Sequence, residues 1–184
     1  MDHPQSNYRM ARECLLDPLE IPADQVHPMP ATAQNPKTAA RSYERVLKQL
    51  FAGDVPRFDI ILLGLGEDGH TASLFPGSAA LRETGHWVVA TEAPGEPKNR
   101  LTMTLPVLNS ASEVFFLVSG RKKAAVLSRV LSGALPSREL PAAQVRPSNG
   151  HVGWWVDRAA AGNLKAGPLS IHPPRGWTGM HRRP

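Results

Sequence analysis

An acidic and a basic side chain, Asp68 and His70, lie two residues apart on a glycine-rich loop. A neutral imidazole near pH 7 can take a proton from a reacting water, and a general base of this kind contributes roughly 10²–10⁴-fold to a rate. A nearby carboxylate can hold the imidazole in one tautomer and stabilise its protonated form. Gly66 and Gly69 bring backbone N–H groups that we expect to be unpaired and able to stabilise an oxyanion. Together these residues predict a reaction site.

The element that must position this loop is the apolar run at residues 60–63. The run is continuously apolar and begins with β-branched residues, so it predicts a strand covered on both faces, as in a parallel sheet of an α/β protein. In such sheets ligands bind just beyond the carboxyl ends of the strands. The loop that carries His70 follows this strand directly, which is where a site is expected.

The other elements alternate as expected for stacked βα units. Asn35 and Pro36 predict the cap and first position of an amphipathic helix that ends near residue 50. The most apolar of the later strands, 114–118, is predicted to be central, and Asp157 to begin a short closing helix. Further strands are expected at 87–91, 101–105 and 152–156, and a further helix at 122–131. We expect one α/β domain over residues 1–164, and a disordered basic tail over 165–184.

The glycines at 64, 66 and 69 also fit the G-x-G-x-x-G pattern of dinucleotide-binding proteins. That interpretation needs a helix long enough to cross back over the sheet, but Pro76 follows within about two turns and blocks it. Asp68 would place a carboxylate where a pyrophosphate must lie. The simplest structural alternative is that the glycines form a tight turn and that Asp68 caps a helix.

Composition limits the function without defining it. The chain has 184 residues, enough for one domain with a substantial core. The single cysteine, Cys14, cannot form an internal disulfide, which fits a reducing compartment, and we expect it to be buried on an apolar helix face. The sequence contains no apolar run of membrane-spanning length, and residues 1–5 lack the basic and apolar regions typical of a signal peptide, so we expect none. We therefore expect a cytoplasmic protein without a membrane partner.

The net charge of +5 does not indicate a nucleic-acid partner. Part of the excess lies in the tail, at Arg175, Arg182 and Arg183. A stripe of basic residues interleaved with aromatic ones, as in nucleic-acid-binding surfaces, is absent from the sequence. None of the seven histidines has a neighbour at a spacing that zinc sites use, so we also expect no metal.

The whole string at residues 64–77, GLGEDGHTASLFPG, resembles the signature of the 6-phosphogluconolactonase family. This family lies within a wider group that includes the amino-sugar-6-phosphate isomerases. Further resemblances follow in family order at 6–9 (SNYR), 99–102 (NRLT), 105–109 (LPVLN) and 120–124 (GRKKA). The resemblance implies a Rossmann-like, mainly parallel sheet flanked by helices. It also implies hydrolysis of 6-phospho-D-glucono-1,5-lactone to 6-phosphogluconate in the oxidative pentose phosphate pathway, without a cofactor.

The resemblance also implies which residues bind a small phosphorylated sugar lactone. Arg100 and Lys123 match substrate-binding positions, and a guanidinium fork and an ammonium are both suited to a phosphate. Asn7 and Arg9 match further family positions, although an asparagine at position 7 would also be explained by capping a helix. Without the resemblance, Lys123 would be a solvated helix residue and Arg100 would flank a strand end.

The main alternative is an isomerase or deaminase that acts on an amino-sugar 6-phosphate. That chemistry moves a proton between adjacent carbons and needs further acid–base groups near the histidine. In the isomerases that this loop resembles, a glutamate follows the histidine within a few residues. Here residues 73–76 (SLFP) contain no carboxylate, which favours the lactonase.

The chain departs from the family pattern at its start. Members carry a first strand, a glycine- and serine-rich phosphate loop and an Asp-Glu-Arg segment before the SNYR stretch, and this sequence shows none of them. We therefore expect an N-terminally truncated form. A non-catalytic remnant that keeps the base and lacks part of the substrate site is the second class of hypothesis.

Overall fold

The computed structural model describes residues 6–30, 32–133 and 139–164. Three strands form a parallel sheet in the order β1-β4-β5. They are β1 (Ile60–Leu63), β4 (Glu113–Val118) and β5 (His151–Val156). The predicted central position of β4 is confirmed. All three carboxyl ends point to one edge of the sheet, the edge at which the His70 loop leaves β1.

The two faces of this sheet differ in burial. Val114, Phe116 and Val118 of β4 lie in the main core, where the Phe116 ring stacks on Trp154 with centroids 4.0 Å apart. The alternating side chains on the other face are open: Ile60 is 59% and Leu62 56% exposed. The expectation that β1 is covered on both faces is therefore wrong. Its apolar run has one buried and one exposed side.

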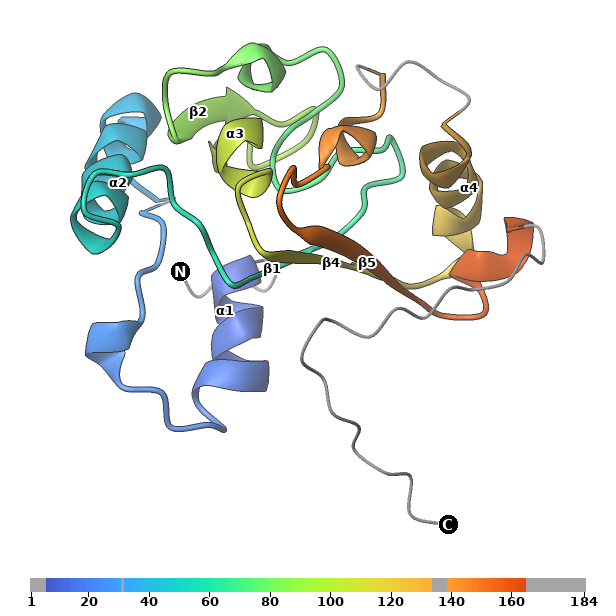
Figure 1. Cartoon of the computed structure of the whole chain (residues 1–184), viewed down its shortest axis with the longest axis horizontal. Helices are drawn as coiled ribbons and strands as arrows, with labels where there is room; N and C mark the ends of the chain where they lie inside the picture. Colours follow the sequence, from blue (N-terminus) through green and yellow to red (C-terminus); the bar gives the residue numbers. More distant parts are fainter. Residues whose placement is uncertain (1–5, 31, 134–138, 165–184) are drawn as a thin grey trace.

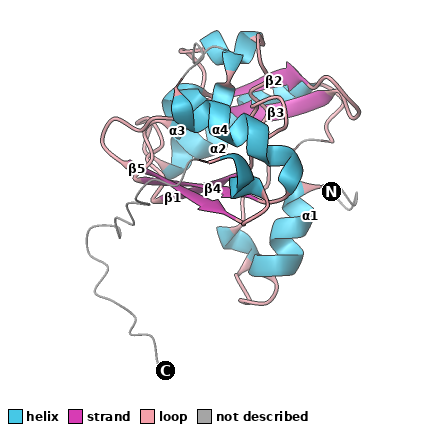
Figure 2. Ribbon diagram, turned by 90° about the vertical axis from the view of Figure 1, so that its right-hand side faces the viewer, coloured by secondary structure: helices cyan, strands magenta, loops and turns pink. Residues whose placement is uncertain are grey.

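The predicted strands near residues 87 and 101 exist, but they form a separate antiparallel pair. They are β2 (Val88–Glu92) and β3 (Asn99–Met103), and Figure 2 shows this hairpin away from the parallel sheet. The second strand ends two residues before Leu105, which instead begins the short helix α3 (Leu105–Leu108). The fold is α/β with a parallel sheet and helices, as predicted, and it carries an additional hairpin.

Helices pack against both the sheet and the hairpin. The helix α2 (Pro36–Leu50) begins where predicted, since Asn35 Oδ1 accepts a hydrogen bond from Thr38 N at 3.1 Å. Apolar residues of α2 pack on the hairpin, whereas α4 (Ala124–Ser132) packs on the buried face of the sheet. Figure 1 shows these two helices on opposite sides of the molecule.

A buried carboxylate fastens α2 to the hairpin. Glu44 is 4% exposed, and its Oε2 accepts hydrogen bonds from the backbone N–H groups of Trp87 at 3.0 Å and Val88 at 3.4 Å. Its Oε1 lies 2.8 Å from Lys48 Nζ. Burial raises the pKa of Glu44, but these hydrogen bonds and the Lys48 charge outweigh burial, so the pKa lies below its ordinary value.

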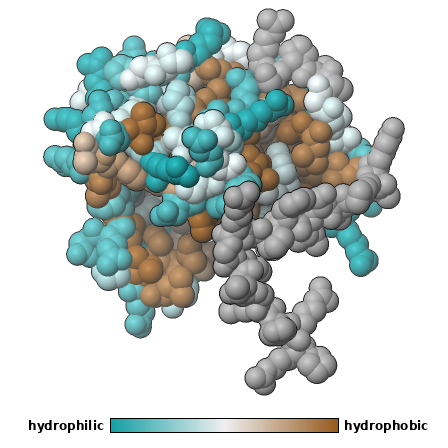
Figure 3. Space-filling view, viewed as in Figure 1, coloured by the Kyte–Doolittle hydropathy of each residue, from teal (hydrophilic) through white to brown (hydrophobic). Residues whose placement is uncertain are grey.

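The N-terminal helices bury little. A short α1 (Asn7–Ala11) continues into a π-helix (Arg12–Leu16), and neither contains a buried residue. Cys14 is exposed, so the expectation that it is buried is wrong. Figure 3 shows apolar surface over these helices, to which Met10 and Leu15 contribute.

The remaining helical turns are short. They are 3₁₀-helices at Ala23–Gln25, Ala79–Arg82, Arg121–Lys123, Pro141–Gln144 and Ala160–Asn163. In the described part of the chain, no helix is long and apolar enough to span a bilayer. The predicted disordered tail lies outside the described residues.

Candidate functional site

The loop after β1 closes on itself through backbone hydrogen bonds. Gly66 N donates to His70 O at 2.8 Å, and Gly69 N donates to Gly66 O at 3.0 Å. Gly69 has φ +87°, a conformation that glycine adopts without strain. The two N–H groups expected to be free oxyanion donors are therefore occupied, so that assignment rests on a wrong premise. Their hydrogen bonds shape the turn instead.

The turn brings Asp68 and His70 into contact. Asp68 Oδ1 lies 2.6 Å from His70 Nδ1 and accepts a hydrogen bond from His70 N at 3.0 Å. Burial raises the pKa of Asp68, but hydrogen bonds from the backbone and ring of His70 and the charge of that ring outweigh burial, so the pKa lies below its ordinary value. Because an ionised carboxylate only accepts, the proton of a neutral His70 lies on Nδ1, and Nε2 keeps a lone pair.

The imidazole is held from two further sides. The Phe75 ring lies against it, with centroids 4.8 Å apart and planes at 49°. On another side it lies over the backbone of Gly66, where an added Cβ would overlap the ring and approach Asp68 Oδ1. Gly66 therefore leaves the space that the His70–Asp68 pair occupies. Sequence spacing predicted the pair but gave no sign of this contact.

Two buried threonines attach the loop to its surroundings. Thr71, 1% exposed, donates from Oγ1 to Gly64 O at 2.9 Å, which ties the loop to the end of β1. Thr102, also 1% exposed, accepts at Oγ1 from Ser73 N at 3.2 Å, which ties the loop to β3. The loop is thus fixed to both sheets.

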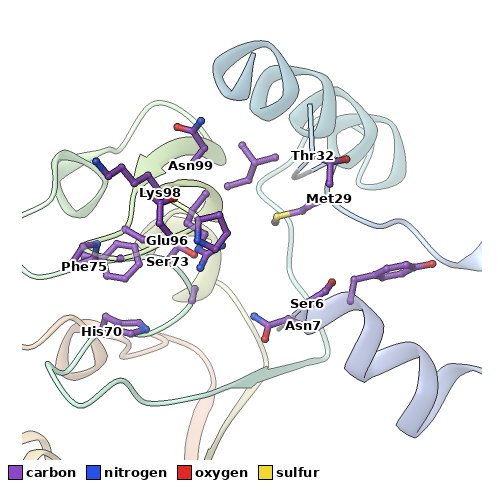
Figure 4. A pocket seen from close by; sticks show the side chains of 18 of the residues that line it. Ser6, Asn7, Met29, Thr32, His70, Ser73, Phe75, Glu96, Lys98 and Asn99 are labelled. Atoms are coloured by element: carbon purple, nitrogen blue, oxygen red, sulfur yellow. The ribbon is translucent and has the colours of Figure 1, made fainter. Parts of the chain in front are cut away.

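His70 opens onto a cleft of about 1410 Å³. The cleft is lined by the start of α1, the segment before α2, the signature loop and the hairpin turn with β3. Of the predicted residues, Asp68, His70, Asn7 and Arg100 line it. Figure 4 shows the His70 ring and the Asn7 side chain facing each other across the cavity. Within the described part of the chain, Nε2 of His70 has no hydrogen-bond partner, so it is available to a ligand.

Other predicted residues lie outside the lining. Lys123 is half-buried in the 3₁₀-helix after β4, at the same edge of the sheet as the loop. Arg9 points along its own helix, with Nε 2.7 Å from Glu13 Oε1. Asn7 is not a cap, because Ser6 accepts the hydrogen bond from Arg9 N that caps α1. The structure therefore brings Arg100, and not Lys123, to the cleft beside His70.

The cleft also contains polar residues that sequence reasoning missed. Lys98 and Asn99 line it on the hairpin side and Thr32 on the α2 side. Glu96 lines it as well, and its Oε2 accepts a hydrogen bond from Lys98 N at 3.1 Å. The sequence does carry one indication that Lys98 belongs to the site. It lies two residues before Arg100 in an extended segment, and alternate side chains of such a segment lie on the same face. In the described ranges, no cluster of three or more His, Cys, Asp or Glu is arranged to hold a metal.

Fold and site together define an α/β protein with a histidine–aspartate pair on a loop at the carboxyl end of a parallel strand. The family of glucosamine-6-phosphate isomerases/6-phosphogluconolactonase matches residues 1–154, and the chain belongs to this family.

Relatives and solved structures agree with this assignment. A 6-phosphogluconolactonase of Rattus norvegicus is 46% identical over 93% of this chain and 66% of its own length. One of Synechocystis is 42% identical over 90% of this chain and 69% of its own. The crystal structure of a 6-phosphogluconolactonase from Leishmania guyanensis superposes with a TM-score of 0.75 at 31% identity, covering 90% of this chain and 70% of that one. The chain thus spans about two thirds of the length of these proteins.

Proposed function

We propose that the chain hydrolyses 6-phospho-D-glucono-1,5-lactone to 6-phosphogluconate, as a step of the oxidative pentose phosphate pathway in the cytoplasm. The observation that carries this proposal is the 2.6 Å contact between Asp68 Oδ1 and His70 Nδ1, which leaves Nε2 as a base at an open cleft. The names of the 36–46% identical relatives support the same substrate. The proposed hydrolysis uses protein groups alone and needs neither metal nor cofactor.

The reaction has two proton transfers. His70 Nε2 takes a proton from water while the water oxygen attacks the lactone carbonyl carbon, which gives a tetrahedral intermediate. Asp68 stabilises the imidazolium that forms. The intermediate then collapses, the bond between the carbonyl carbon and the ring oxygen breaks, and the imidazolium returns its proton to that oxygen. The product is an open-chain acid that ionises in water, and His70 is again neutral.

Arg100 is assigned to the substrate's phosphate. It lines the cleft from β3, and a guanidinium can donate two parallel hydrogen bonds to a phosphate. Asn7 also lines the cleft, and we assign its side-chain amide to the substrate as a second hydrogen-bond donor. Lys123 and Arg9 stay in the proposal as cations outside the lining of the cleft, and Gly66 and Gly69 as the turn that shapes the substrate-facing loop.

His70→Gln tests the proposal, because glutamine keeps polarity but cannot shuttle a proton. We expect acid release from freshly prepared 6-phosphogluconolactone, corrected for spontaneous opening, to fall by at least about 10²-fold. The matched control is His151→Gln, since His151 Nδ1 also lies beside a carboxylate, 3.2 Å from Glu113 Oε1, but outside the cleft. Equal rates for His70→Gln and wild type would remove His70 from the mechanism.

The same preparation distinguishes the isomerase alternative. Incubation with glucosamine 6-phosphate should release no ammonia and form no ketose phosphate, because residues 73–76 supply no carboxylate next to His70. Turnover of the amino sugar without turnover of the lactone would replace the proposed reaction by the alternative. A chain that binds 6-phosphogluconate and turns over neither compound would be the non-catalytic form.

A further inference from the structure

Thr102 joins the two parts of the proposed site. Its side chain is buried in β3, and its hydroxyl accepts from Ser73 N at 3.2 Å and donates to Met103 O at 3.0 Å. Ser73 lines the cleft and lies three residues after His70 in the same loop. The hydroxyl is therefore oriented by one partner on each side. It connects the loop that carries the base with the strand that carries the cation.

Strand geometry relates Thr102 to Arg100. The two residues are separated by one position in β3, so their side chains lie on the same face of the hairpin. The antiparallel register fixes β3 in place, with Arg100 opposite Thr91 and Thr102 opposite Val89. Arg100 also lines the cleft. A loop anchored at Thr102 is thus anchored two residues away from Arg100 in the same strand.

We propose that Thr102 is a positioning residue that fixes the separation between His70 and Arg100. The inference rests on the proposed function, since it concerns how one substrate meets both groups. A phosphorylated lactone held at its phosphate by Arg100 places its carbonyl carbon at one distance only from Nε2. A misplacement of about 1 Å between reacting groups can cost about 10²-fold in rate. A lactone without a phosphate is not bound by Arg100, so its carbonyl carbon can still approach His70 Nε2 when the loop is displaced.

The test compares two lactones on Thr102→Val and Thr102→Ser. Valine matches threonine in shape but cannot accept from Ser73 N, whereas serine keeps the hydroxyl. For T102V we expect kcat/KM to fall about tenfold or more with the 6-phosphorylated lactone and less than about threefold with the unphosphorylated lactone. T102S should retain the wild-type ratio between the two substrates. Equal losses on both lactones would show a merely structural role and would overturn the inference.

A double-mutant cycle with Arg100→Ala gives the second readout. If Thr102 acts through Arg100, T102V should add less than about twofold to the loss already caused by R100A on the phosphorylated lactone. Additive losses would overturn the inference and leave the proposed function standing. A wild-type chain that hydrolyses neither lactone would refute the proposed function and this inference with it. If T102V fails to fold, Thr102→Ala against Thr102→Ser carries the same comparison.

Discussion

At the scale of single residues, the absence of a side chain at Gly66 leaves the space in which the His70 ring contacts Asp68 and can act as a base. In Gly66→Ala the new Cβ would overlap the imidazole, so the ring must leave Asp68. We expect kcat for the lactone to fall by at least about 10²-fold, toward the value of His70→Gln, because the base is no longer oriented. The measurement is steady-state hydrolysis together with far-UV circular dichroism to confirm the fold.

Gly64→Ala is the matched control for that substitution. A Cβ at Gly64 meets nothing within 4 Å, although Gly64 lies in the same loop. Its activity should stay within about twofold of wild type, as for surface substitutions away from a site. If both variants lost activity equally, a general sensitivity of the loop, and not the contact between Gly66 and His70, would be the cause.

The lowered pKa of Asp68 predicts a pH-dependent part of the stability. A carboxyl whose folded-state pKa is depressed stabilises the fold above its unfolded pKa of about 3.9, and this stabilisation is lost as the pH falls through the lower folded value. The difference in free energy of unfolding between wild type and Asp68→Asn should therefore shrink as the pH falls below about 4. Urea unfolding at a series of pH values measures it. Asp54→Asn, which removes an exposed carboxyl beyond the end of α2, is the control for the loss of one negative charge.

The residue pair was predictable and its surroundings were not. Asp68 and His70 share one short loop, so two-residue spacing alone places them together. The expectation that the N–H groups of Gly66 and Gly69 are free was wrong, because the turn pairs them itself, as Gly66 N does with His70 O. Sequence does not show which hydrogen bonds close a loop. Arg100 was placed by resemblance, while Lys98 lies in an equally suitable position that no motif marked.

At the scale of elements, Glu44 should determine how firmly α2 holds the hairpin. Glu44→Gln removes the charge that accepts from Trp87 N and pairs with Lys48. Hydrogen bonds to a charged group contribute about 1.5–3 kcal/mol each, so we expect a loss of about 2 kcal/mol in the free energy of unfolding. Chemical denaturation followed by tryptophan fluorescence measures it, because Trp87 lies at this contact.

An exposed ion pair provides the comparison for Glu44. Glu13→Gln breaks the contact with Arg9 Nε, but both side chains are partly solvated, 48% and 38% exposed. Pairs of this kind contribute about 0–1 kcal/mol. A loss from Glu13→Gln as large as that from Glu44→Gln would mean that burial does not set the strength of the Glu44 contact.

The strands were predictable one by one, but their pairing was not. Periodicity located β1, β4 and β5 within a few residues, since each is a short apolar run. The alternation of strands and helices suggested one parallel sheet. This interpretation did not take into account the length of the connection between β2 and β3. Residues 93–98 between β2 and β3 are too few for a parallel crossover, which needs about a dozen residues or more, so the connection already indicated a hairpin.

At the scale of the whole molecule, the open face of the parallel sheet should bind hydrophobic dyes. Ile60, Leu62, Leu117 and Trp155 are 59%, 56%, 52% and 65% exposed on this face. Contiguous apolar surface of this kind is uncommon on soluble monomers and promotes association. Leu117→Lys should lower the fluorescence of a bound naphthalene-sulfonate dye and reduce light scattering at high protein concentration.

Leu50→Lys is the control, because Leu50 is 51% exposed at the end of α2, away from the sheet. Its dye binding should match that of wild type. If Leu50→Lys and Leu117→Lys reduced the dye signal equally, dye binding would follow total surface charge and not the sheet face.

The division of the site between two sheets has a consequence for how new specificities can arise. The base lies on a loop after a parallel strand, while Lys98, Asn99 and Arg100 lie on a hairpin with its own packing against α2. Substitutions at positions 98–100 can therefore change which end group a substrate must carry, while Thr102 still anchors the loop that carries His70. A library that varies positions 98–100 while holding residues 64–77 constant should yield hydrolysis of neutral or differently charged lactones more readily than a library of the loop. In this molecule, substrate specificity can change through the hairpin while the catalytic loop keeps its sequence.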